Sequence, residues 1–216
     1  MSRNIYTILL TVPMLFSACN STTKAIVPKE KIAQNVEVIE TATIKSKPIS
    51  KTTSVTYVND KKDIQSLGEA NIESFMVTLK APLKQLIQID KSYKSAMGGC
   101  SSIAMSRTDE YNAISETKVR RTALKYRNPK NKPDETDTIV MERFLANNTK
   151  KSLVVDMPNS YRVYKPLYMK PQCLACHGEN ISPELQKILK RTYPKDMATG
   201  FKLGEFRGVV VAKVKK

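Results

Sequence analysis

Five consecutive residues, Cys173-Leu174-Ala175-Cys176-His177, combine two thiols and an imidazole. Thiols separated by two residues can reach the two vinyl groups of one porphyrin, and a histidine directly after them can rise to the iron as proximal ligand. His177 is the only histidine of the 216 residues. The spacing therefore predicts one covalently attached haem c, bound through Cys173 and Cys176 with His177 on the iron.

Three other arrangements could use the same cysteines. A thioredoxin-like redox pair would need a βαβ context, which is not evident around Cys173 and Cys176. A zinc site could recruit Cys100 to make a Cys3His set, but the adjacent residues Cys176 and His177 would struggle to occupy two corners of one tetrahedron. A structural disulfide would leave His177 unexplained. Haem attachment accounts for the whole motif.

The N-terminus reads as an export signal. Arg3 precedes a short apolar run that ends in the segment Leu15-Phe16-Ser17-Ala18-Cys19. The run is too short to cross a bilayer, which takes about 20 residues, so residues 1–18 are predicted to be a signal peptide. The segment resembles the lipobox of bacterial lipoproteins, although Phe16 departs from the usual aliphatic residue. The resemblance implies an acylated Cys19 and a periplasm-facing, lipid-anchored protein; an ordinary signal peptide with a coincidental cysteine is the alternative.

Export agrees with haem attachment, which takes place outside the cytoplasm. Asn20 stands where inner-membrane lipoproteins carry Asp, which favours the outer membrane. Residues 19–62 are predicted to be the lipid anchor and a flexible tether, because they are rich in Ser, Thr, Lys and Val without a sustained helical period. The tether still holds β-branched residues that could form one strand: Val36, Val38, Ile44, Val55 and Val58.

The chain is strongly basic, with a net charge of +16. Beyond the membrane that holds the lipid anchor, a basic field favours an acidic redox partner or anionic lipid head groups. Nucleic acid is not an expected partner, because the basic residues are scattered rather than interleaved with aromatic ones.

The residues themselves leave the second axial ligand of the iron open. A second histidine is impossible within the chain, so a methionine or a cysteine remains. For the methionines, core packing is the commoner role. Cys100 is an odd thiol in an oxidising compartment, and a thiolate would favour ferric iron and lower the reduction potential. The candidates are Met97, Cys100, Met105 and Met169.

The helices and strands that must position these residues are predicted from the spacing of apolar residues along the chain. Apolar residues recur at helical spacing from Ile64 to Ile87, and Pro82 is expected to kink or break this helix. A second helical stretch is predicted over residues 83–113. Gly98-Gly99 should interrupt it or mark the close approach of another group.

Strands and loops dominate the rest of the chain. Residues 127–133 are predicted to be loop because they hold two prolines. Residues 137–147 resemble a short helix, and strands are predicted over 153–155, 161–164 and 208–214. Helices followed by strands predict an α+β domain over residues 63–216 with an antiparallel sheet.

From about Leu83 to its end, the chain resembles the single-haem c domains with a PAS-like fold that were long catalogued as a domain of unknown function. The most diagnostic block, residues 121–133, resembles the family's Arg…Arg-Asn-Pro-x-Asn-x-Pro signature. The other matching blocks are residues 96–104, 164–178 and 193–208.

The resemblance implies a PAS-like antiparallel sheet with N-terminal helices packed around a covalently bound haem. Cys100 matches the cysteine that supplies the second axial ligand in such proteins, and Met97, one turn away, could replace it if the thiolate leaves on reduction. Arg121 and Arg127 could hold the haem propionates, because guanidinium pairs with carboxylates in a bidentate manner. Loop anchoring is the alternative role for both arginines.

Three functions could use such a site. The preferred one is a redox or small-gas sensor, in which reduction, NO or CO displaces Cys100 and moves its helix. An electron-transfer cytochrome that keeps both ligands is the alternative. Peroxidase-like chemistry would need distal acid–base groups, and no second histidine exists, so no enzyme activity is expected. Because Lys216 ends the chain, a sensor of this kind is expected to signal through a separate protein.

Overall fold

The computed structural model describes residues 53–216. The predicted signal peptide, Cys19 and the tether up to residue 52 lie outside the described residues, as does the side chain of Cys100. Within the described part, no helix has both the length and the apolar character needed to span a bilayer.

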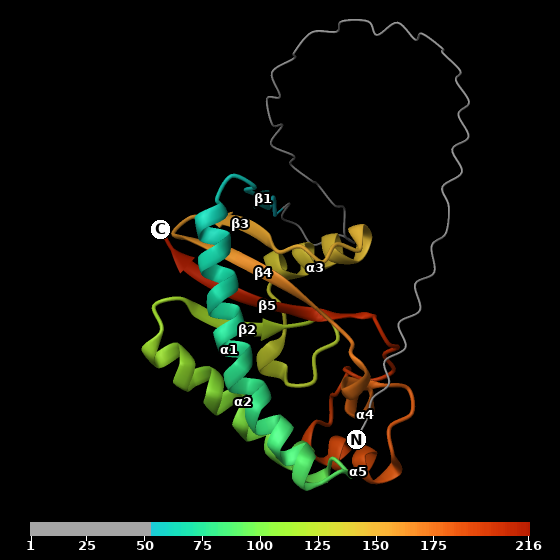
Figure 1. Cartoon of the computed structure of the whole chain (residues 1–216). Helices are drawn as coiled ribbons and strands as arrows, with labels where there is room; N and C mark the ends of the chain where they lie inside the picture. Colours follow the sequence, from blue (N-terminus) through green and yellow to red (C-terminus); the bar gives the residue numbers. More distant parts are fainter. Residues whose placement is uncertain (1–52) are drawn as a thin grey trace, which may run out of the picture. The chain divides into compact units, whose positions relative to one another are not determined.

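An antiparallel sheet of five strands forms the centre of the domain, in the order β1-β3-β4-β5-β2 (Figure 1). Strand β5, the last strand along the chain, is valine-rich and buried on both faces. Its side chains point alternately into two cores. Val210 packs with the core on one face, whereas Val209 and Val211 pack with the core on the other. The strands are β1 Thr56–Tyr57, β2 Lys118–Thr122, β3 Leu153–Met157, β4 Ser160–Tyr168 and β5 Phe206–Lys215.

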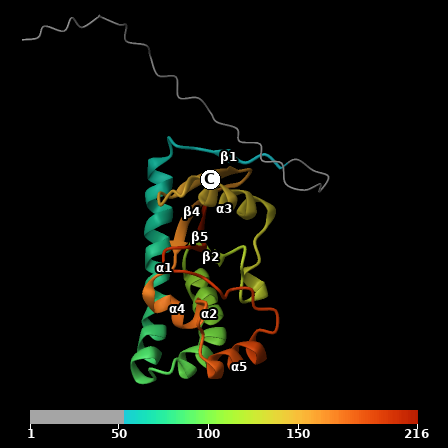
Figure 2. The same ribbon diagram turned by 90° about the vertical axis from the view of Figure 1, so that its right-hand side faces the viewer.

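Helices cover both faces of this sheet. The long helix α1 packs Ile72, Phe75 and Leu79 into the core on one face, and α2 packs beside α1 (Figures 1 and 2). On the other face, α3 contributes Val140 and Phe144 to the second core. The helices are α1 Lys62–Ile89, α2 Lys94–Ile114, α3 Glu135–Asn147, α4 Leu174–His177 and α5 Pro183–Thr192, with single 3-10 turns at η1 Pro129–Asn131 and η2 Pro171–Cys173.

The predicted α+β class with an antiparallel sheet is confirmed, and so are the strands near residues 153–155, 161–164 and 208–214. The helix predicted over 137–147 begins at Glu135, where Asp134 and Asp137 form a capping box. The stray strand allowed in the tether is β1, and Val55 is buried beside it. Packed structure therefore begins before the predicted boundary at residue 63.

A helix break at Pro82 or at Gly98-Gly99 is wrong, whereas the other interpretation of the two glycines, the close approach of another group, is confirmed. Helix α1 continues through Pro82 to Ile89, because the packing of α1 against the sheet and α2 outweighs the one hydrogen bond that proline removes. Helix α2 likewise runs through Gly98-Gly99. A Cβ at Gly99 would lie 3.0 Å from Leu86 Cδ1 of α1, so this glycine marks the close approach of another helix.

The break between the first two helices falls at Asp90–Tyr93 instead. The carboxylate of Asp90 accepts hydrogen bonds from the backbone N–H groups of Ser92 and Ser95, at 2.9 and 2.8 Å. Tyr93 adopts a left-handed backbone with φ of 64°. The turn between α1 and α2 is thus stabilised by the polar side chain of Asp90. Pro82 and Gly98-Gly99 do not form it.

Candidate functional site

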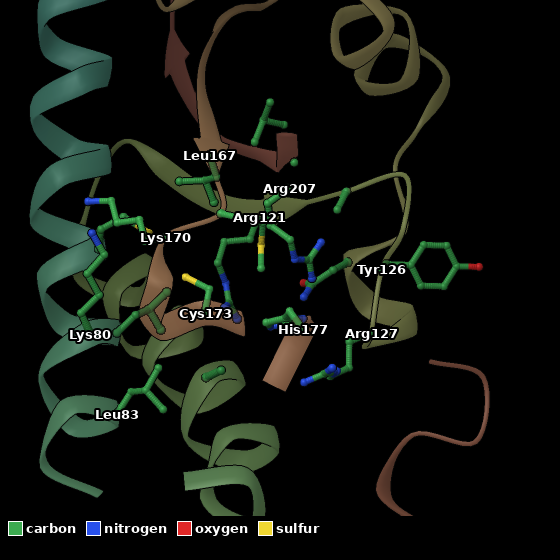
Figure 3. A pocket seen from close by; sticks show the side chains of 18 of the residues that line it. Lys80, Leu83, Arg121, Tyr126, Arg127, Leu167, Lys170, Cys173, His177 and Arg207 are labelled. Carbon is green, nitrogen blue, oxygen red and sulfur yellow. The ribbon is translucent and has the colours of Figure 1, made fainter. Parts of the chain in front are cut away.

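The Cys173–His177 motif follows the end of the central strand β4. A register shift between Leu167 and Tyr168 ends the regular pairing of β4 with β5, and Pro171 then opens the turn η2, which leads directly into α4. Residues four apart on a helical turn share one face. Cys173 and His177 accordingly both line one cavity, as Figure 3 shows.

This cavity has a volume of about 490 Å³ and lies between the two long helices, the sheet and the Cys173–His177 motif. Its size falls within the range of about 300–1,000 Å³ common for cofactor sites. Apolar side chains form much of its wall: Met76, Leu79, Leu83, Leu86, Ile103, Ala104, Leu167, Met169 and Val209. Basic side chains join this wall: Lys80, Arg121, Arg127, Lys170 and Arg207.

His177 is held in one tautomer by the protein. Its Nδ1 lies 2.7 Å from the carbonyl oxygen of Ala198, and because a carbonyl only accepts, Nδ1 donates and Nε2 keeps its lone pair. Burial, aided by the positive charges of Arg127 and Arg207, lowers the pKa of His177 to about 3. The ring is therefore neutral at physiological pH, which is the form that ligates metals.

The loop that supplies the Ala198 carbonyl is fastened to the motif at several points. The backbone N–H of Phe201 donates to the carbonyl of His177, and that of Gly200 donates to the carbonyl of Gly178, both at 3.0 Å. Lys125 lies over the Phe201 ring, with Nζ 4.2 Å from its centroid. These contacts fix the end of α4 against the loop.

The two cysteines of the motif have different surroundings. Cys173 lines the cavity and packs with Met169 and Phe201. Cys176 is half-buried against the core between α2 and α5, which contains Met97. No disulfide bond joins Cys173 and Cys176. Among the described side chains, no three His, Cys, Asp or Glu groups are placed to hold a metal ion.

Three arginines from different elements meet at the cavity wall, and two of them were predicted from the sequence. Arg121 reaches it from β2, and Arg127 reaches it from the segment that follows. Arg207, at the start of β5, was missed; its only signal was its place in the matching block 193–208. Burial and the charges of Arg127 and Arg121 lower the pKa of Arg207 to about 10. This end of the cavity is therefore strongly electropositive.

Arg127 also serves as a structural connection. Its Nε donates to Asp196 at 3.0 Å, and its Nη2 donates to the carbonyls of Cys176 and Ala198 at 2.6 and 3.2 Å. The side chains of this ion pair are only 11% and 9% exposed. Loop anchoring, one of the two roles considered for Arg127, is thus present in the structure.

The candidates for the second axial ligand lie in different places. The backbone of Cys100 belongs to α2, one turn before Ile103 and Ala104, which both line the cavity. Met169 is buried and lines the cavity as well. Met97 is buried in the core between α2 and α5, outside the cavity lining, and its sulfur lies 3.9 Å from Arg127 Nη1. Met105 is half-buried and is not part of that lining.

Comparison with known proteins identifies the family. The domain is similar in structure to a crystal structure of the cyanobacterial haem protein Tll0287, with a TM-score of 0.57 and 21% sequence identity over 73% of this chain and 98% of that one. Identity this low shows a shared fold. No curated protein matches the sequence. The sequence model of the Tll0287-like family, however, matches residues 17–214. The chain therefore belongs to the Tll0287-like family.

Proposed function

We propose that this protein binds one haem c in the cavity, through thioether bonds to Cys173 and Cys176 and with His177 as the proximal iron ligand. The observation that carries the proposal is the neutral His177 ring, locked by Ala198 at the wall of an apolar cavity beside the Cys173 thiol. Similarity to the haem protein Tll0287 supports haem binding.

The residues of the cavity suit the two chemical halves of a haem. The leucine, isoleucine and valine side chains of the wall match an apolar macrocycle and exclude water from it. Two propionate carboxylates would balance the positive charge at the other part of the wall, where Arg121 and Arg207 lie. Arg127 was expected to share this role, but its pairing with Asp196 makes Arg207 the better partner.

When bound, a haem supplies one-electron redox chemistry and an iron that can bind small gases. The chain's own contribution is to present His177 as a neutral ligand of fixed orientation. Position 100 lies one helical turn from residues 103 and 104 of the wall. This spacing supports Cys100 as the distal ligand, with Met97 as its replacement after a movement of α2.

Within this class we favour a redox or small-gas sensor, in which Cys100 would be displaced on reduction or by NO or CO, and α2, which carries Cys100, would shift. The protein would then be a lipoprotein anchored through Cys19, facing the periplasm and preferably in the outer membrane, and would signal through a separate protein. It would carry no catalytic activity. The alternative is an electron-transfer cytochrome whose basic surface docks an acidic redox partner, which the net charge of +16 supports.

The first test is haem attachment. The full chain is produced together with a haem-attachment system, denatured and weighed by mass spectrometry. We expect the mass of one haem that survives denaturation, and its loss in a Cys173→Ala/Cys176→Ala double variant. A colourless wild-type protein without added mass would refute the proposal.

The second test separates the two functions by optical spectroscopy of the haem protein in both oxidation states. Rapid CO binding to the reduced form favours the sensor, whereas a six-coordinate spectrum unaffected by CO favours electron transfer. Cys100→Ser should change the ferric spectrum strongly if Cys100 is the distal ligand. An unchanged ferric spectrum excludes it.

A further inference from the structure

We infer that the buried ion pair of Arg127 and Asp196 is a positioning and tuning device for His177, and that it sets the reduction potential of the bound haem through the Ala198 carbonyl. This inference rests on the proposed function. It concerns two residues that lie outside the Cys173–His177 motif.

The geometry places three groups around one carbonyl oxygen. Ala198 O accepts from His177 Nδ1 at 2.7 Å and from Arg127 Nη2 at 3.2 Å, so its two lone pairs serve both donors. The same Nη2 donates to the carbonyl of Cys176 at 2.6 Å, directly before the proximal histidine. Arg127 therefore holds both sides of His177: the loop that orients its ring and the backbone that carries it.

The pair also fixes the conformation of the loop itself. Asp196 accepts two hydrogen bonds: Oδ2 accepts one from Arg127 Nε at 3.0 Å, and Oδ1 accepts one from the backbone N–H of Ala198 at 2.8 Å. Asp196 thus connects the guanidinium to Ala198, the residue whose carbonyl orients the ring. With both side chains nearly buried, solvent screening of this pair is weak.

The electrostatic consequence has a definite sign. A carbonyl that also binds a guanidinium is a weaker acceptor for the Nδ1–H group, so His177 donates less charge to the iron than it would to an unshared carbonyl. The positive charge of Arg127 acts in the same direction, since it favours the more electron-rich ferrous state. Asp196 opposes this effect by compensating the charge of Arg127.

Single substitutions should therefore move the potential in opposite directions. Arg127→Met removes the cation and leaves a buried carboxylate, so it should lower the potential. Asp196→Asn leaves the cation uncompensated, so it should raise the potential. We expect each change to alter the redox equilibrium constant about tenfold, which is ~59 mV for a one-electron couple. The double variant should lie between the two single variants, and Arg127→Lys, which keeps the charge, should lie closer to wild type than Arg127→Met.

The matched control is Arg162→Met, which breaks a pairing of the same chemistry with Asp134, at 2.7 Å. Arg162 is 19% exposed and is not part of the described cavity lining. Its removal should leave the potential unchanged.

The measurement is spectroelectrochemical titration of the haem-loaded full chain and its variants. Opposite shifts in Arg127→Met and Asp196→Asn support the inference, because mere loosening of the loop would shift both potentials in the same direction. Shifts of one sign, or shifts no larger than in Arg162→Met, overturn it. If Arg127→Met retains no haem, a raised potential in Asp196→Asn with Arg127→Lys near wild type supports the inference, and any other result overturns it. A wild-type chain without haem overturns the proposed function and this inference together, whereas unchanged potentials in haem-loaded variants overturn only the inference.

Discussion

Replacing Gly68 by alanine should destabilise the domain, whereas the same replacement at Gly98 should stabilise it. Gly68 of α1 faces Val163 of the central strand β4, and a Cβ at residue 68 would lie 2.4 Å from Val163 Cγ2 and 2.5 Å from Val163 Cβ. Carbon atoms in contact lie about 3.5–4.0 Å apart. Val163 is fully buried, so either its strand or α1 must move.

The size of the effect follows from two opposing contributions. Alanine favours a helix over glycine by about 1 kcal/mol, and overpacking a core costs about 1–3 kcal/mol. The severity of the overlap at Gly68 places its cost at the upper end, for a net loss of about 2 kcal/mol. At Gly98, no atom lies within 4 Å of the added Cβ, so only the helical gain remains.

Thermal unfolding followed by far-UV circular dichroism measures both changes without requiring a bound cofactor. A domain of this size shifts its Tm by about 2–4 °C per kcal/mol. Gly68→Ala should therefore melt roughly 4–8 °C below wild type, and Gly98→Ala roughly 2–4 °C above it. A Gly68→Ala protein that melts at or above the wild-type temperature would refute the close packing of α1 on β4.

Two further predictions concern Phe201 in the loop and Asp134, the N-cap of α3. Phe201→Ala should lower the free energy of unfolding by about 3–5 kcal/mol, because the ring is buried under Lys125. Leu203 is exposed, so Leu203→Ala should change the free energy of unfolding, measured with denaturant, by less than about 0.5 kcal/mol; equal losses in the two variants would contradict this. Burial raises the pKa of Asp134, but hydrogen bonds from the Asp137 N–H and Arg162 outweigh it, and the pKa is lowered. That stabilisation is present above the unfolded pKa of about 3.9 and is lost as pH falls through the folded value, so the Tm advantage over Asp134→Asn should shrink below about pH 4. A constant advantage would contradict it.

Features that depend on neighbouring residues were predicted well. The C-terminal strand and the hairpin of β3 and β4 both follow from spacing or period over a few residues. A break at Pro82 was predicted wrongly from an equally local signal, and of the two interpretations of Gly98-Gly99 only the close approach of another group is confirmed. There, packing of α1 on the sheet and of α2 on α1 outweighed the intrinsic preference of single residues.

The sequence by itself determined which groups are available for haem chemistry: two thiols and one imidazole at a fixed covalent spacing. Only the tertiary structure decided that His177 meets the carbonyl of Ala198, that Arg127 connects both to Asp196, and that Arg207 faces the same cavity. These residues are far apart along the chain. Their contacts depend on how strands pair and helices pack across the whole domain, and no local pattern of residues records that arrangement.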